Sequence, residues 1–198
     1  GWAMMDNNKV ICYISVYASK YAAQQLIKYN LQPWAFVGSF YTEGLLFKDR
    51  DSYLDDYIVD SYTGTDTEVI IPFTYQNVYV AGIGSKAFYN CIFLKKIVFS
   101  SHIKSIGNSA FEGCEQLTNI VIPDNVTNIG EFAFSGCVKL TSINIPKSVI
   151  SIGDFAFLNC KNLTIHYEGT KEQWKAICPV DIGARESVII VCADGTIE

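Results

Sequence analysis

The chain has 198 residues and a formal net charge of −5 at pH 7, with 49% hydrophobic and 18% charged residues. This composition excludes a disordered tail and allows one or two domains with a sizeable core. No apolar run reaches the length of a membrane-spanning helix, and 7 basic against 6 acidic residues over 67–165 leave no basic stripe for a nucleic-acid backbone.

The first 51 residues predict a small β-α-β unit. Residues 9–18 and 34–47 are rich in β-branched and aromatic types, which favours a strand in each. Between them Ser19 is suited to cap a helix over 20–29. The apolar face of that helix would carry Ala22, Ala23, Leu26 and Ile27. Residues 1–51 therefore form either an independent domain or an N-terminal cap, and we favour the cap because the repeats that follow need a covered end.

The polar and acidic residues 48–56 predict a surface loop or a linker. After it, residues 57–59 and 68–71 predict a β-hairpin around the turn-forming residues 63–66. A longer loop is expected over 73–79. We place the domain boundary inside the acidic loop and assign residues 52–198 to a second domain.

A pattern with a period of 23 residues runs through residues 83–163. Each unit opens with Ile-Gly, continues with Ala-Phe, and has Cys three residues after Phe and Leu three residues after Cys. The four Phe-Cys pairs are Phe88 and Cys91, Phe111 and Cys114, Phe134 and Cys137, and Phe157 and Cys160. A fixed period of this length is typical of stacked repeats, in which units that cannot bury their apolar positions alone share one core.

A single unit predicts one strand and one tight turn. Ile120 and Ile122 alternate with Asn119 and Val121, as in a strand with one buried face. Pro123 ends this strand because proline has no N–H for a ladder. Residues 131–137 suit one helical turn, with small Ala and Cys where neighbouring coils crowd. Stacked coils should rise by roughly 4.8 Å, the spacing of paired strands.

Residues 164–198 predict a C-terminal cap. Ile165 and Tyr167 replace the repeat strand in a shifted register. Thr170-x-x-Gln173 is a capping box that opens a short helix. This helix should carry Trp174 as a lid on the last coil, and residues 188–191 should form a last strand.

The repeat resembles the BspA-like, or Treponema-type, leucine-rich repeat, whose motif reads Leu-x-x-Ile-x-Ile-Pro-x-x-Val-x-x-Ile-Gly-x-x-Ala-Phe-x-x-Cys. Residues 117–137 and 140–160 match every named position, whereas residues 94–114 depart at Phe99 and Ser100. The resemblance implies an α/β leucine-rich-repeat solenoid. It also implies a non-catalytic protein-binding or adhesion module, often at a cell surface, with host or bacterial surface proteins as partners. The chain starts without a secretion-signal pattern, so a cytoplasmic location stays open beside a secreted or cell-surface one.

No residues are assigned a catalytic or metal-binding role, and no cofactor is expected. His102 and His166 have no nucleophile or carboxylate in a catalytic pattern near them. The repeated cysteines predict buried apolar side chains, because stacked copies hold their Cβ atoms about a coil rise apart, farther than the ~3.8 Å of a disulfide. The alternative function is a small-ligand or enzymatic site in residues 1–66, with the repeats as a docking arm.

The outward positions of the repeat strands form the candidate binding strip on the expected concave face. Curved sheets of stacked repeats present extended binding surfaces. The strip comprises Lys96, Val98, Asn119, Val121, Ser142, Asn144 and His166. Tyr79 is expected at its leading edge.

Overall fold

The computed structural model describes residues 2–6, 9–13, 41–51, 54–178, 181–182 and 188–197. The helix expected over 20–29 lies outside the described residues. The strand expected over 9–18 is described as β2 (Lys9–Tyr13), which pairs antiparallel with β1 (Trp2–Asp6). Of the strand expected over 34–47, residues 41–47 are described, and among them the strand begins at Leu45.

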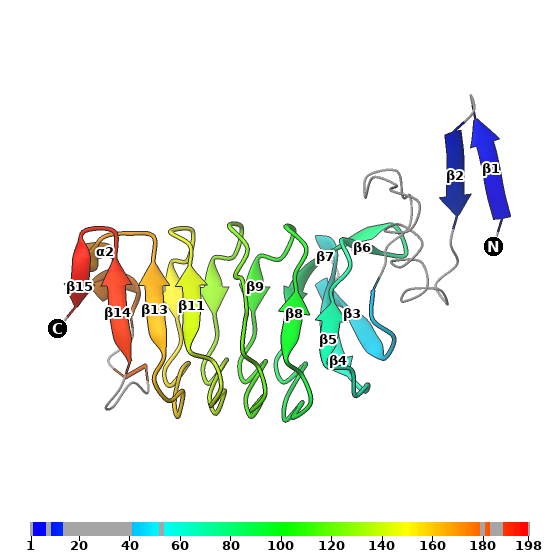
Figure 1. Ribbon diagram of the computed structural model, residues 1–198. Helices are drawn as coiled ribbons and strands as arrows, with labels where there is room; N and C mark the ends of the chain where they lie inside the picture. The colour runs from blue at the N-terminus through cyan, green and yellow to red at the C-terminus, as the bar shows by residue number, and fades with distance from the viewer. Residues whose placement is uncertain are drawn as a thin grey trace.

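The repeats form a solenoid, and two ladders of strands run along it (Figure 1). We call the first ladder the front sheet: β5 (Glu68–Ile70), β8 (Lys96–Val98), residues 119–121, β11 (Ser142–Ile145), β13 (Thr164–Tyr167), β14 (Ile189–Cys192) and β15 (Gly195–Ile197). We call the second the rear sheet: β3 (Leu45–Asp51), β4 (Leu54–Tyr62), β7 (Val78–Ile83), β9 (Ser105–Ile106), β10 (Asn128–Ile129) and β12 (Ser151–Ile152). The predicted solenoid with 23-residue repeats is thereby confirmed.

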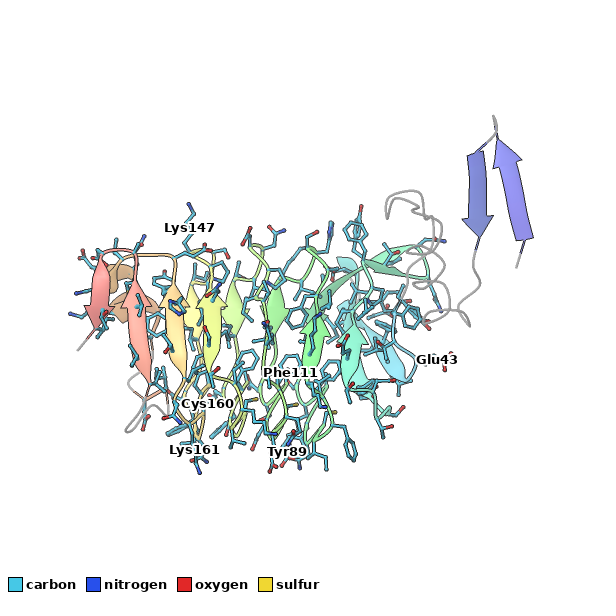
Figure 2. All side chains as sticks on the ribbon, in the orientation of Figure 1. Glu43, Tyr89, Phe111, Lys147, Cys160 and Lys161 are labelled. Carbon is cyan, nitrogen blue, oxygen red and sulfur yellow. The ribbon has the colours of Figure 1, made fainter. Side chains whose placement is uncertain are left out.

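Equivalent side chains of successive coils stack in columns inside the solenoid. The rings of Phe88, Phe111, Phe134 and Phe157 are fully buried. Neighbouring rings in this column lie 5.1, 5.4 and 5.6 Å apart at interplanar angles of 8° or less. Figure 2 shows Phe111 within this arrangement. Because each ring packs on the next, the core is continuous along the repeats.

The prediction of a helical turn over 131–137 is wrong, because the structure has tight turns there. The N–H of Ser135 donates to the carbonyl of Phe132, and the N–H of Cys137 donates to the carbonyl of Phe134, each at 3.1 Å. These are successive tight turns, since Phe132 has a left-handed φ of 54° that a right-handed helix does not contain. The N–H of Phe134 instead donates to the carbonyl of Ala156 in the next coil, at 2.8 Å. Bonds between coils therefore replace the bonds of a helix.

The hairpin expected between 57–59 and 68–71 is also wrong. β4 pairs antiparallel with β3 and parallel with β7, whereas β5 pairs parallel with β8 in the front sheet. The turn at 63–67 thus leads from one sheet to the other, and most of the acidic stretch 48–56 lies in strands rather than a loop. Local turn chemistry predicted a turn here but could not tell which strands flank it.

The loop expected over 73–79 is a tight hairpin. β6 (Thr74–Tyr75) pairs antiparallel with β7. Gln76 and Asn77 connect the two strands with φ of 51° and 66°, the left-handed conformation that two-residue hairpins require. The ring of Tyr75 stacks on Phe47 with centroids 4.3 Å apart and meets Tyr57 edge-on at 5.2 Å.

The last residues of the predicted first domain join the rear sheet. β3 ends at Asp51 and is paired to β4 along its length, with irregularities after Leu46 and Asp49. Such irregularities discourage pairing of an edge strand with another chain. The division into residues 1–51 and 52–198 remains a prediction.

The C-terminal end contains α2 (Lys171–Ile177), which begins with the predicted capping box. The N–H of Gln173 donates to Thr170 Oγ1 at 3.2 Å, and the N–H of Thr170 donates to Gln173 Oε1 at 2.9 Å. Trp174 is buried and lies 5.4 Å from the ring of Tyr167. The shifted register is confirmed, because Ser142 pairs with Thr164 rather than with a residue 23 positions on.

Candidate protein-binding face

The structure brings all seven residues of the binding strip to the exposed face of the front sheet. Lys96 pairs with Asn119, Val121 with Asn144, and Asn144 with His166. Ser142 precedes Asn144 by two residues and so shares its face. All seven side chains are exposed. The residues between them, such as Ile143 and Ile165, are buried because successive side chains of a strand point to opposite sides of the sheet.

Tyr79 does not belong to the binding strip, contrary to the expectation. It lies in β7 of the rear sheet and pairs with Thr74. Its ring stacks on His102 at 4.2 Å and meets Phe73 edge-on at 5.3 Å. The 23-residue period could not place Tyr79, because the β6–β7 hairpin lies ahead of the first regular unit.

The exposed face divides into an apolar half and a polar half. Ile70, Val98 and Val121 are 43%, 42% and 66% exposed, and they follow one another across three coils. The polar half holds a shallow depression of about 340 Å³. Its lining residues are Ser142, Asn144, His166, Tyr167 and Glu168.

The sequence missed two exposed residues of this face, Ile70 and Glu168, and it missed Tyr167, which lines the depression although its side chain is buried. Ile70 belongs to the half-repeat that leads the array, and its register with Val98 identifies its outward position. Tyr167 and Glu168 follow the one-residue shift after the last regular unit. Applying the strand alternation through both irregular units would have found Ile70 and Glu168, but not Tyr167, whose side chain is buried.

Few charges lie on the face. Glu68 and Lys96 are neighbours in the register of β5 and β8, so opposite charges adjoin at its leading end. At the other end Glu168 Oε2 accepts a hydrogen bond from the N–H of Lys147 at 3.4 Å. Figure 2 shows Lys147 at the upper rim. Recognition would thus rest on shape, apolar contact and neutral hydrogen-bonding groups rather than on a strong field.

The repeated cysteines are unpaired and largely inaccessible. Cys114, Cys137 and Cys160 are buried, and each thiol donates to a carbonyl of the preceding coil at 3.1–3.3 Å. Burial raises the pKa of the Cys160 thiol to about 12 and raises the pKa of the Cys137 thiol well above its ordinary value. A thiol that keeps its proton is a poor nucleophile and metal ligand, so the column is structural.

We expect alkaline pH to weaken the fold through these thiols. Unfolded thiols ionise near pH 9, whereas Cys160 keeps its proton to about pH 12. Between these values the folded chain binds more protons than the unfolded chain, so the free energy of unfolding falls as pH rises. Urea unfolding at pH 8 and pH 10 measures this fall. The fall in the free energy of unfolding from pH 8 to pH 10 should be smaller by about 1 kcal/mol in Cys160→Ala than in the parent chain. An identical fall in the variant would contradict the role of the Cys160 thiol.

Within residues 41–51, 54–178 and the shorter described segments, no group of three or more His, Cys, Asp or Glu side chains is placed to hold a metal ion. In the same residues no helix has the length and apolar character to cross a membrane. Most of residues 1–66, where the alternative small-ligand or enzymatic site was placed, has no described side chains. That alternative stays a prediction.

Comparison with known proteins identifies the repeats. The family model described as BspA type leucine rich repeat region matches residues 81–170 in six copies. These are BspA-type leucine-rich repeats. The resemblance found in the sequence motif is confirmed, and the BspA-type array includes every residue of the binding strip. No match was found among curated proteins.

Solved structures of bacterial leucine-rich repeat proteins are similar to this solenoid. The Treponema pallidum leucine rich repeat protein is 26% identical, with a TM-score of 0.61 over 74% of this chain and 63% of its own. A leucine-rich repeat protein from Bacteroides ovatus is 30% identical, with a TM-score of 0.55 over 64% of this chain and 37% of its own. A leucine rich cell surface protein from Faecalibacterium prausnitzii is 32% identical, with a TM-score of 0.52 over 72% of this chain and 43% of its own. The chain therefore spans less than two thirds of each of these three relatives.

Proposed function

We propose that the protein is a non-catalytic module that binds another protein through the exposed face of the front sheet. The observation that carries this proposal is the continuous register from Lys96 to His166, which presents exposed side chains in rows across successive coils. The main chain of each strand bonds to its neighbours, so the rows of side chains are already ordered before a partner binds. Prearranged side chains of this kind lower the entropy lost on binding.

The face is large enough for one partner. From β5 to β14 it spans five strand spacings, or about 24 Å. A standard interface covers about 800 Å² per partner, so such a complex would use most of the face. The apolar half would supply the desolvated centre, with Val121 the most exposed of its three residues at 66%. The polar half would fix the orientation of the partner.

An adhesion role at a cell surface is the finer form of this proposal. It is supported by the relative from Faecalibacterium prausnitzii, which is described as a cell surface protein. Host or bacterial surface proteins are then the partners to test. The secreted or cell-surface location of this chain is part of the same proposal.

We expect the double variant Asn119→Arg and Asn144→Arg to weaken partner binding at least about tenfold. Both side chains are exposed at the middle of the face, where two long cations would block contact and bury unpaired charge. The measurement is the dissociation constant for a surface protein captured by the intact chain. Its folded state is checked by circular dichroism.

The matched control is Asn128→Arg with Ser151→Arg. These residues are exposed and lie in β10 and β12 of the rear sheet, so the control adds the same charge away from the front face. Binding should be unchanged in the control. If both double variants bind equally well, the partner does not use the front sheet.

A further inference from the structure

The tip of the first repeat carries an apolar patch that its later copies lack. Tyr89, Ile92 and Phe93 are 45%, 46% and 55% exposed, and we call them the tip patch. The equivalent residues one unit later are Glu112, Glu115 and Gln116, and two units later they are Ser135, Val138 and Lys139. Among the four regular units, only the first is apolar at all three positions. Figure 2 shows Tyr89 at the lower rim of the solenoid.

Within the described part of the chain, the coil before the first repeat does not cover the tip patch, because that coil is short. Val59 pairs with Ile83, and Glu68 pairs with Lys96. The coil before the first repeat, which we call the leading coil, therefore runs from the rear sheet to the front sheet in nine residue steps, whereas the first repeat uses thirteen. The next turn again takes thirteen steps, from Ile106 to Asn119. The leading coil therefore turns back before it reaches the tip.

Backbone hydrogen bonds show the same gap. Between the first and second repeats, three N–H groups donate across the turn, from Lys86, Phe88 and Asn90 to the carbonyls of Asn108, Ala110 and Glu112. From the leading coil, Tyr62 donates to Ala87 at 2.8 Å. The carbonyl of Tyr89 corresponds to that of Glu112, and no N–H from the described part of the chain reaches it. The tip thus presents both apolar area and an open acceptor.

The chain itself re-enters the described fold beside this gap. The N–H of Thr63, in the short turn, donates to the carbonyl of Gly44 at 3.0 Å. The preceding residues 14–40 are rich in aliphatic and aromatic types, and their charged residues are Lys20 and Lys28, with no acidic residue among them. Glu112 and Glu115 continue two of the three columns next to the tip patch, so the charges are complementary.

We propose that residues 14–40 of the same chain cover the tip patch. The N-terminal segment then completes the short leading coil, and its docking is a property of the first repeat rather than of the front sheet. This proposal is independent of the proposed function, because none of its residues belongs to the binding strip.

The test places a photo-activated crosslinking amino acid, p-benzoylphenylalanine, at Ile92 in the full chain. The matched control places it at Lys161, the exposed residue at the same position of the fourth unit. After irradiation, mass spectrometry of the monomer should find peptides from residues 14–40 linked to position 92 and not to position 161. Equal yields at both positions would overturn the proposal. Links between two chains, with a yield that rises with protein concentration, would assign the tip patch to a second copy instead.

A second measurement does not depend on crosslinking. Phe93→Asp should speed tryptic cleavage after Lys20 and Lys28 of the full chain by about tenfold, since a charge on the tip patch would release the covering residues. Asn162→Asp, at the same position of the fourth unit, should leave the cleavage rates unchanged. Equal rates in Phe93→Asp and the parent chain would contradict the proposal.

Discussion

Replacing Phe134 with alanine is expected to lower the free energy of unfolding by about 3–5 kcal/mol. The ring is fully buried, and it stacks between Phe111 at 5.4 Å and Phe157 at 5.6 Å. Its removal leaves a cavity in the middle of the column, where the rigid coils on both sides cannot close in. Chemical denaturation followed by circular dichroism measures the change.

The control for this variant is Phe132→Ala, two residues earlier in the same turn. Phe132 is half-buried, and among the described residues its ring stacks on Phe155 alone, at 5.2 Å. It should cost about 1 kcal/mol, because water can fill the space that its ring leaves. A loss below about 1 kcal/mol for Phe134→Ala would mean that the Phe column does not support the core.

Replacing Gly107 with alanine is expected to cost about 3 kcal/mol, the upper end for added core volume. An added Cβ would meet the backbone of the preceding coil, with Ser85 N at 2.6 Å and Gly84 C at 2.7 Å. Backbone atoms held by ladder bonds cannot move aside as a flexible side chain can. Thermal and urea unfolding of the variant measure the cost, and a stability within about 0.5 kcal/mol of the parent would contradict it.

A variant at Gly136 tests backbone strain without the crowding between coils that is expected at Gly107. Its φ is +73°, but the nearest atoms to an added Cβ are 3.5 Å away, an ordinary contact. Gly136→Ala should therefore cost only about 1 kcal/mol, from the left-handed conformation alone. Gly136→Asn should cost less, since Asn90 and Asn159 hold the same position of other units at φ of 56° and 61°. If Gly107→Ala and Gly136→Ala cost the same, close approach of the coils is not the reason for the Ile-Gly pattern.

Where the 23-residue period holds, sequence reasoning predicted the stacked coils and the exposed face, but not the tight turns that replace the expected helical turn at 131–137. Asn119 and Asn144 were assigned to the surface from strand alternation alone, and both are exposed. Ahead of the first regular unit the predictions failed, whereas the capping box and the shifted register beyond the last regular unit were confirmed. Tyr79 was placed on the wrong sheet because the preceding hairpin has no counterpart in the repeats.

The sequence by itself determined the register of the stack, because identical spacing places identical side chains above one another and only one alignment buries the Ile, Phe, Cys and Leu columns together. The tertiary structure decided how the ends are built. Whether β4 pairs with β5 or with β7 depends on contacts between distant residues, and the short leading turn can be measured only once both sheets are in register. The left-handed φ of Phe132 is likewise imposed by the neighbouring coils, since nothing in the local sequence favours it.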